Sequence, residues 1–204
     1  YCIPWRYLCD GKWDCPMGHD EVECARYLCP GQYKCANQSS CILLQQLCDG
    51  HRQCPMGDDE WYCDLQCPTG CSCIGLSVNC RGANLTYLES NFVSRSVRKL
   101  DLSYNRLGPN LSQTNFDSYH DLGELILNHN EIEVLTPRKF HQLRNLYKLD
   151  LSYNQIHSVK RGAFAGLRRV TQLLLESNQQ LFLLEPEAFF GLSSLQMLNI
   201  SSSR

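Results

Sequence analysis

The chain has 204 residues, a formal net charge of −2 and 14 cysteines, all of which lie between Cys2 and Cys80. A pI near 6.3 leaves no broad basic field, which argues against nucleic acid as a partner. No run of about 18 apolar residues is present to span a bilayer, and no leader precedes Tyr1. The cysteines lack thioredoxin-type or zinc-type CxxC pairs, so they indicate a disulfide framework made in an oxidising compartment. We therefore expect a piece of a secreted or cell-surface protein.

The first third of the chain contains the same segment twice. Residues 9–24 (CDGKWDCPMGHDEVEC) and 48–63 (CDGHRQCPMGDDEWYC) agree at ten of sixteen positions, with an offset of 39 residues. Self-similarity at a fixed spacing of this size indicates tandem small modules. We predict a truncated module over residues 1–24, a linker over 25–28, a complete module over 29–63 and a second linker over 64–66.

The second half follows the pattern LxxLxLxxNxL, which starts at Val97, Leu122, Leu146, Val170 and Leu195. Spacings of 25, 24, 24 and 25 residues are those of leucine-rich repeats, so residues 97–204 predict four repeats and the start of a fifth. Each repeat is expected to supply a short strand to a parallel sheet on the concave face of a solenoid. Further repeats are expected to follow. An asparagine is expected to close each strand: Asn105, Asn130, Asn154 and Asn178. A spine of phenylalanines is expected to line the far side of the solenoid: Phe116, Phe140, Phe164 and Phe189.

Residues 67–80 (CPTGCSCIGLSVNC) stand between the modules and the repeats. The spacing resembles the amino-terminal disulfide cap of extracellular leucine-rich repeat proteins, and we assign residues 67–96 to this cap. The resemblance implies that Cys67 pairs with Cys73 and Cys71 with Cys80. A zinc site is the competing interpretation, although Cys-x-Cys fits poorly around a tetrahedral ion.

Residues 29–63 contain six cysteines and resemble the low-density-lipoprotein-receptor class A module. The resemblance implies three disulfides in this module: Cys29 with Cys41, Cys35 with Cys54, and Cys48 with Cys63. In the first copy it pairs Cys9 with Cys24, and it leaves Cys2 and Cys15 to partners expected before Tyr1. Because about 35 residues bury too little apolar surface, such a module needs disulfides and a bound ion.

The class A resemblance implies a calcium ion in each copy, held by six oxygen ligands. The expected first set is Asp10, Asp14, Asp20 and Glu21 with the backbone carbonyls of Tyr7 and Lys12. The expected second set is Asp49, Gln53, Asp59 and Glu60 with the carbonyls of Gln46 and His51. Gln53 replaces a carboxylate by a neutral amide, so we expect weaker binding at the second site, partly restored by nearby Asp58. The alternative is a solvated acidic loop that binds nothing.

The order of class A modules, cap and repeats is similar to the ectodomain of relaxin-receptor-like (type C) leucine-rich-repeat G-protein-coupled receptors. Tandem modules are typical of the invertebrate, molluscan branch, and FDSYHDLGELILNHNEI (residues 116–132) resembles the corresponding repeat. The resemblance implies a cell-membrane receptor whose extracellular side binds a peptide or protein ligand. It implies that a seven-helix domain outside this chain carries the signal to a G protein and is the only contact with the membrane. A non-signalling adhesion or matrix protein is the second interpretation, and an endocytic receptor the third.

The candidate ligand surface is formed by four acids on successive strands: Asp101, Glu124, Asp150 and Glu176. The resemblance implies this role, because relaxin receptors hold basic residues of the hormone on an acidic patch of the concave face. An ordinary solvated sheet of mixed charge is the alternative. Four sequons indicate a glycosylated surface: Asn37, Asn84, Asn110 and Asn199. No catalytic motif is present, so an enzyme is not expected.

Overall fold

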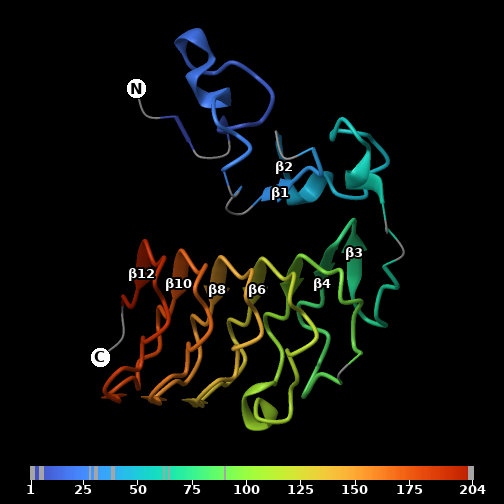
Figure 1. Ribbon diagram of the computed structural model, residues 1–204. Coiled ribbons are helices and arrows are strands. Elements are labelled where there is room, and N and C mark those ends of the chain that lie inside the picture. The colour runs from blue at the N-terminus through green and yellow to red at the C-terminus, as the bar shows by residue number, and fades with distance from the viewer. Residues whose placement is uncertain are drawn as a thin grey trace. The chain divides into compact units, whose positions relative to one another are not determined.

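The computed structural model describes residues 3–4, 7–27, 29, 32–37, 40–61, 63, 65–89 and 91–201 (Figure 1). Cys2, for which a partner before Tyr1 is expected, lies outside the described residues. The chain forms two compact units, one of Tyr1–Leu65 with Ile74–Ser77 and the other of Gln66–Cys73 with Val78–Arg204. In the part of the chain that the structure describes, no helix has the length and apolar character needed to cross a membrane.

The first unit has little regular secondary structure. Strands β1 (Gln32–Lys34) and β2 (Cys41–Leu43) form an antiparallel pair. The described helices of this unit are short 3-10 segments: η2 (Pro16–Glu21), η3 (Leu44–Gln46) and η4 (Asp58–Glu60). Cysteines make up most of the buried apolar set in both modules, with few aliphatic side chains beside them. The modules therefore depend on covalent links where a larger domain would use an apolar core.

The described cysteines form six disulfides, and these join the pairs that the sequence resemblance implies: Cys9–Cys24, Cys29–Cys41, Cys35–Cys54, Cys48–Cys63, Cys67–Cys73 and Cys71–Cys80. Cys15 is not joined to another described cysteine. All four cysteines of the alternative zinc site are used in the last two disulfides, so a zinc site of thiolates is excluded there.

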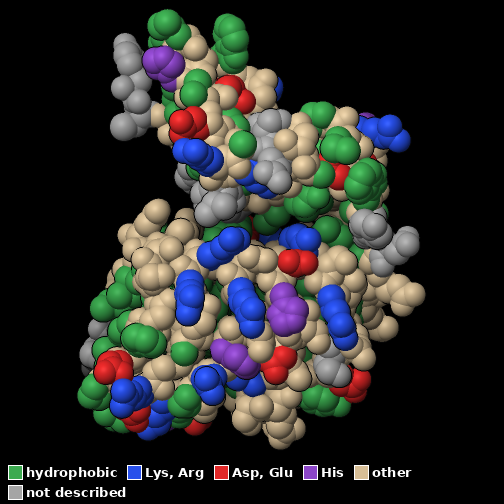
Figure 2. Space-filling model, viewed as in Figure 1, with side chains coloured by type: hydrophobic (Ala, Val, Ile, Leu, Met, Phe, Trp, Pro, Cys, Tyr) green, Lys and Arg blue, Asp and Glu red, His purple; other side chains and the backbone are tan. Residues whose placement is uncertain are grey.

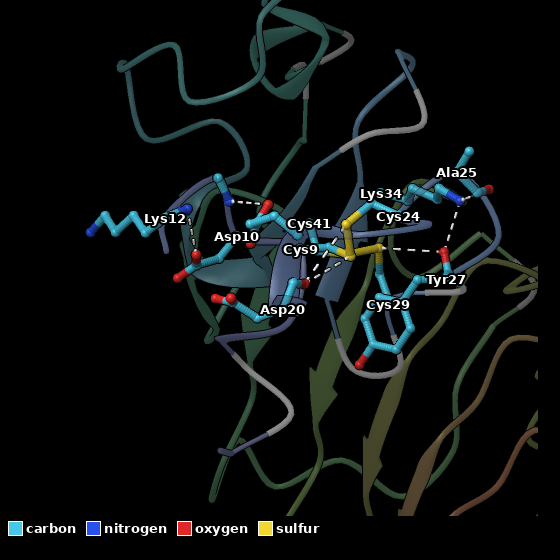
Figure 3. Close-up of a disulfide and its surroundings, with 12 residues drawn as sticks. Cys9, Asp10, Lys12, Asp20, Cys24, Ala25, Tyr27, Cys29, Lys34 and Cys41 are labelled. Atoms are coloured by element: carbon cyan, nitrogen blue, oxygen red, sulfur yellow. Dashed lines mark hydrogen bonds between the residues drawn. A yellow bond between two sulfur atoms is a disulfide. The ribbon is translucent and has the colours of Figure 1, made fainter. Parts of the chain in front are cut away.

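The two modules contact each other at their first disulfides (Figure 3). The Cys41 N–H donates to the carbonyl oxygen of Cys9 at 2.6 Å, and both cysteines belong to one buried cluster. Lys34 Nζ donates to the carbonyl oxygens of Ala25 and Tyr27 at 2.6 and 2.7 Å, which ties the second module to the linker. Two modules joined only by a flexible linker would not make these hydrogen bonds.

The second unit is a solenoid of leucine-rich repeats (Figure 1). Its seven-stranded sheet has the order β12-β10-β8-β6-β5-β4-β3, and the strands of the repeats pair in parallel. The strands are β3 (Ser72–Ile74), β4 (Ser77–Asn79), β5 (Lys99–Asp101), β6 (Glu124–Ile126), β8 (Lys148–Asp150), β10 (Gln172–Leu174) and β12 (Met197–Asn199). On the far side β7 (Val134–Leu135), β9 (Ser158–Val159) and β11 (Leu183–Leu184) pair in parallel, and η5 (Gly108–Asn110) lies in the first repeat.

The strands of the first four repeats, β5, β6, β8 and β10, each have one buried residue between two partly exposed ones, because successive side chains point to opposite faces. Leu100, Leu125, Leu149 and Leu173 occupy the same register and have no exposed surface. Phe116 and Phe140 lie 5.7 Å apart between ring centroids, as do Phe164 and Phe189, which forms the predicted spine. The core is therefore a column of identical contacts between neighbours.

The asparagine at the end of each strand holds the turn by side-chain hydrogen bonds, as the sequence predicts. Asn154 Nδ2 donates to the carbonyl oxygens of Leu127, Leu151 and Ser152 at 2.9–3.1 Å. Its Oδ1 accepts from the N–H groups of Asn130 and Ile132 at 2.9 and 3.1 Å. One amide thus satisfies five buried backbone groups in two repeats, which apolar side chains cannot do.

Candidate functional site

The first class A loop is closed by carboxylates that accept hydrogen bonds from its own backbone. Asp10 Oδ1 accepts from the Lys12 N–H at 2.9 Å, and Glu21 Oε2 accepts from the Gly11 N–H at 3.1 Å. Gly11 has a φ of +85°, which favours glycine at this position. Tyr7, another expected contributor, closes a turn onto Pro4 with an N to O distance of 3.0 Å. The acids therefore shape the loop as well as charging it.

Asp20 is the most enclosed acid of the first loop, with 3% of its surface exposed. Its two carboxylate oxygens accept from the N–H groups of Asp14 and Cys15 at 2.7 and 3.1 Å. Burial raises the pKa of Asp20, but these backbone bonds outweigh it and leave the pKa below its usual value. Burial instead raises the pKa of Glu21, helped by the charges of Asp10 and Asp20.

The second loop repeats this arrangement. Asp49 Oδ1 accepts from the His51 N–H at 2.8 Å, and Asp59 Oδ2 accepts from the Gln53 N–H. The Glu60 carboxylate accepts from the N–H groups of Asp49 and of Gly50 at 3.0 and 3.1 Å. Gln46, whose carbonyl is an expected ligand, ends η3, and its side-chain oxygen accepts from the Leu43 N–H at 2.8 Å.

Gln53 differs in its contacts from the aspartate at the matching position. Its amide Nε2 donates to both carboxylate oxygens of Asp49, at 3.2 and 3.0 Å. Gln53 Oε1 and Asp59 Oδ1 are both buried without a hydrogen-bond partner. The amide therefore supports Asp49 while leaving two hard oxygens free in the same loop.

Asp58 has a structural role that sequence reasoning missed. It is buried, and its Oδ2 accepts from the Tyr33 hydroxyl at 3.0 Å and from the Ala36 N–H at 2.7 Å. Asp58 Oδ2 thus links η4 to β1 and to the residue that follows Cys35, while Asp58 Oδ1 is buried without a hydrogen-bond partner among the described residues.

The donor set of both loops suits a calcium ion. Among the described residues, no group of three or more His, Cys, Asp or Glu side chains converges as a metal site. The buried, unpartnered oxygens of Glu21, Gln53 and Asp59 are nevertheless hard ligands of the type that calcium selects. Oxygen without a partner in a buried loop is costly, and a cation would remove that cost.

On the concave face, Glu124 is neutralised by its neighbours. Lys99 Nζ lies 3.2 Å from Glu124 Oε2, and the Tyr147 hydroxyl donates to Glu124 Oε1. Burial and this carboxylate raise the pKa of Tyr147 well above its usual range. Glu124 therefore serves the sheet as an acceptor between two strands.

The other three acids also have local partners. Asp150 Oδ2 accepts from Asn128 Nδ2 at 3.2 Å, and Glu176 accepts from the Tyr153 hydroxyl at 3.4 Å. Asp101 Oδ1 accepts from the Ser103 N–H at 2.9 Å. In the sheet register Asp101 and Asp150 flank Ile126, while Glu124 lies between lysines, so the acids do not share one row. The face carries mixed charge, with each acid hydrogen-bonded within the fold.

A row of stacked rings lies directly after the strands and was not found from the sequence. The rings of Tyr104 and His129 lie 4.0 Å apart between centroids, and those of His129 and Tyr153 4.7 Å apart, nearly parallel. The Arg81 guanidinium lies 3.9 Å from the centre of the Tyr104 ring. All three stacked residues have φ between 53° and 57°, and the tyrosines are 45% and 48% exposed. Burial and Arg81 lower the pKa of His129, against the opposing charge of Asp150.

The four sequons differ in accessibility. Asn37 and Asn84 are exposed, and Asn110 lies at the end of η5 with part of its surface buried. Asn199 is half-buried in β12, where its Nδ2 donates to Glu176 Oε2 at 3.2 Å. A glycan attached at Asn199 would replace this bond.

Comparison with known protein families agrees with this architecture. "Leucine rich repeat" matches residues 95–156, 120–180 and 144–204, which together cover more than half of the chain. "Leucine rich repeat N-terminal domain" matches residues 66–88, and "Low-density lipoprotein receptor domain class A" matches residues 1–24. The chain therefore belongs to the leucine-rich repeat family and carries class A sequence at its amino-terminal end. Both are extracellular domain types that typically bind other molecules without catalysing reactions.

Among curated proteins, human amphoterin-induced protein 2 is 40% identical over 80 residues, 39% of this chain. The mouse protein is 40% identical over 81 residues, 40% of this chain. The matched segment spans only 15% of the length of either relative. Among solved structures, human trophoblast glycoprotein has 27% identity, a TM-score of 0.48 and a match over 55% of this chain and 43% of its own.

Proposed function

We propose that this chain is the ligand-recognition region of a cell-surface receptor, and that the concave side of the repeats binds a peptide or protein. The ring stack of Tyr104, His129 and Tyr153 carries the proposal. Tyrosine is enriched at the energetic centres of interfaces, and stacked rings lose little conformational freedom on binding because they are already ordered. The mixed charge beside them supplies hydrogen-bonding partners for a polar rim.

The test uses a phage library of secreted peptides panned against the whole chain. Tyr153→Ala should weaken binding of the selected peptides by more than tenfold, as measured by surface plasmon resonance. Tyr87→Ala is the matched control, since Tyr87 is similarly exposed at 47% but lies in the cap. Equal affinity of all selected peptides for Tyr153→Ala and Tyr87→Ala would place the ligand surface elsewhere.

The finer proposal is a relaxin-receptor-like G-protein-coupled receptor, supported by the order of class A modules, cap and repeats. The short linker 64–66 sets this chain apart from receptors in which a long linker carries the module. The full-length coding sequence decides the matter: seven apolar helices after the repeats support the receptor, whereas a single span or none excludes it. A G protein is proposed as a partner only if seven apolar helices follow the repeats.

A non-signalling adhesion or matrix protein is the second candidate. It is supported by the 40% identity to amphoterin-induced protein 2, since this relative is a leucine-rich repeat protein and not a G-protein-coupled receptor. Beads coated with the chain should then bind cells or matrix without raising a second messenger. An endocytic receptor would instead remove bound ligand from the medium, which labelled-ligand uptake measures.

We also propose that both class A loops bind calcium, through the sets expected from the sequence. The ion would neutralise the clustered carboxylates and allow each loop to close. Asp10, Asp14, Asp20 and Glu21 supply four charges in the first loop, and Asp49, Asp59 and Glu60 supply three in the second. Calorimetric titration after chelation should resolve a tighter and a weaker site, and a titration without heat or change in circular dichroism would reject both.

A further inference from the structure

Positive charge is concentrated in one part of the repeats, although the chain as a whole is slightly acidic. Residues 134–175 contain eight lysines and arginines against one carboxylate, Asp150. Figure 2 shows Lys, Arg and His side chains gathered on the face of the repeats that is in view. Neither the proposed peptide site nor the calcium loops account for this charge.

Four side chains occupy the same place in four consecutive repeats. Each is the second residue of a four-residue turn that leads into a strand, and we call them the basic row: Arg95, His120, Arg144 and Arg168. All four are exposed. The turns are closed by equivalent N–H to carbonyl bonds of 3.1–3.4 Å: Val97 to Ser94, Leu122 to Tyr119, Leu146 to Leu143, and Val170 to Leu167.

The core fixes the position of the basic row. Leu143 and Leu146, which flank the Arg144 turn, have no exposed surface, and the same is true of Leu167 and Val170 around Arg168. Neighbouring strands lie about 4.8 Å apart, so four successive repeats place their equivalent turns on a line about 14 Å long. The row is therefore a regularly spaced array whose turns are held by the packed core.

The arginines of the row are free of carboxylates. Within the described residues, no ion pair joins Arg95, Arg144 or Arg168 to an acid, whereas Lys160 and Arg161 are paired with Glu185 and Glu187. The Arg144 side chain donates a hydrogen bond to a neutral amide, Gln142 Oε1, at 3.3 Å. Unpaired guanidinium groups can bind oxyanions in the bidentate geometry that suits sulfate and carboxylate.

The acids beside the row are already compensated. Asp121 lies 3.4 Å from Arg98 Nη1 and accepts from Asn145 Nδ2 at 3.2 Å, while Asn145 in turn accepts from Arg169 at 2.8 Å. This bridge lies next to the row and contains two arginines for one carboxylate. Asp117, three residues before His120, lies 3.9 Å from His141 Nδ1. The local field is therefore positive.

We propose that the basic row binds a sulfated polysaccharide of the cell surface or matrix. The disulfides place the chain where such polymers occur and nucleic acids do not. A linear polyanion matches a line that carries three arginines, with a hydrogen-bonding histidine between the first two, and release of its counterions drives binding that weakens with salt. A further fit is steric, since none of the four sequons lies in the turns that carry the row.

Heparin is the probe, with the whole chain applied to a heparin column and eluted by sodium chloride. The double variant Arg144→Gln with Arg168→Gln should elute at clearly lower salt and bind heparin at least tenfold more weakly. The matched control, Arg106→Gln with Arg161→Gln, removes the same charge from exposed arginines outside the row and should elute close to the unmodified chain.

Three outcomes would overturn the proposal: no retention of the unmodified chain at 150 mM salt, equal shifts of the two double variants, or equal binding to phosphatidylserine vesicles and heparin. The last result would indicate an anionic membrane surface instead. Thermal denaturation of both double variants checks that they fold. Peptide binding at Tyr153 is measured separately, so failure of either site leaves the other intact.

Discussion

The class A modules and the repeats solve the same problem of stability by different means. In the second module the buried apolar set is Cys29, Cys35, Cys41 and Cys54 with Ile42 and Leu47, whereas each repeat contributes leucines with no exposed surface to a continuous core. A module of about 35 residues has too much surface for its volume, and stacked repeats share their buried faces. Small size, more than sequence composition alone, accounts for the disulfides of the modules.

The two regions also treat buried polar groups differently. In the repeats a neutral asparagine satisfies backbone groups and has no formal charge to neutralise. In the modules carboxylates such as Asp20 and Asp59 accept from the loop backbone and leave a concentration of negative charge. Only the second arrangement gives a reason to recruit a cation, so the proposed ion binding would be coupled to the stability of the modules and not to that of the repeats.

The largest expected effect comes from removing a disulfide of the second module. Cys35→Ser with Cys54→Ser should destabilise this module by about 2–5 kcal/mol, enough to unfold a domain of this size. Limited proteolysis should then cut within residues 29–63 while the thermal transition of the repeats stays unchanged. Protection of residues 29–63 in this variant would show that the apolar contacts suffice.

Removing one buried, uncharged amide side chain should destabilise the repeats. Asn154→Ala leaves five buried backbone groups without their partner, and each unsatisfied group costs about 1–3 kcal/mol before relaxation or water entry. We expect a loss of at least about 3 kcal/mol in chemical denaturation monitored by circular dichroism. Asn128→Ala is the control, because Asn128 lies on the partly exposed side of the sheet, and it should cost far less.

Much of the repeat fold could be predicted from the sequence, because each position recurs every 24 or 25 residues with the same burial. Asn105 and Phe140, for example, lie where the pattern places them. The two acidic loops were less predictable. The resemblance supplied the positions of Asp49 and Gln53, but the hydrogen bonds from the Gln53 amide to the Asp49 carboxylate depend on side-chain direction, which spacing does not fix.

The ring stack and the role of Asp58 escaped sequence reasoning for a related reason. Tyr104, His129 and Tyr153 follow the strands as ordinary polar or aromatic residues in a turn, and their alignment comes from a positive φ repeated in each copy. Asp58 was expected to add charge to the loop, which stays a prediction, and its hydrogen bonds with Tyr33 and Ala36 give it a structural role as well. Contacts between residues distant in the sequence determine both the alignment of the rings and the direction of the Asp58 side chain.

A carboxylate at position 53 should sharpen the difference between the two calcium loops. Gln53→Asp restores the charge that Asp14 supplies in the first copy and should tighten calcium binding at the second loop by roughly tenfold, about 1.4 kcal/mol. Without calcium the same variant should be less stable, since it replaces the Gln53–Asp49 hydrogen bonds by charge repulsion. Calorimetry with and without a chelator measures both effects, and unchanged affinity would mean that residue 53 is not a ligand.

The smallest expected effect is a pH dependence confined to the repeats. Because the folded state lowers the pKa of His129, the unfolded chain binds more protons as the pH falls, and the stability contributed by the neutral imidazole is complete only above about pH 6.5. The melting temperature of the repeats should therefore fall from pH 7.5 to pH 5.5. His129→Phe keeps a flat ring between Tyr104 and Tyr153 but cannot take up a proton, so its melting temperature should fall less over the same range. Asp150→Asn removes the charge that favours the imidazolium and should make the fall larger, and an identical fall in all three proteins would assign the pH dependence to other groups.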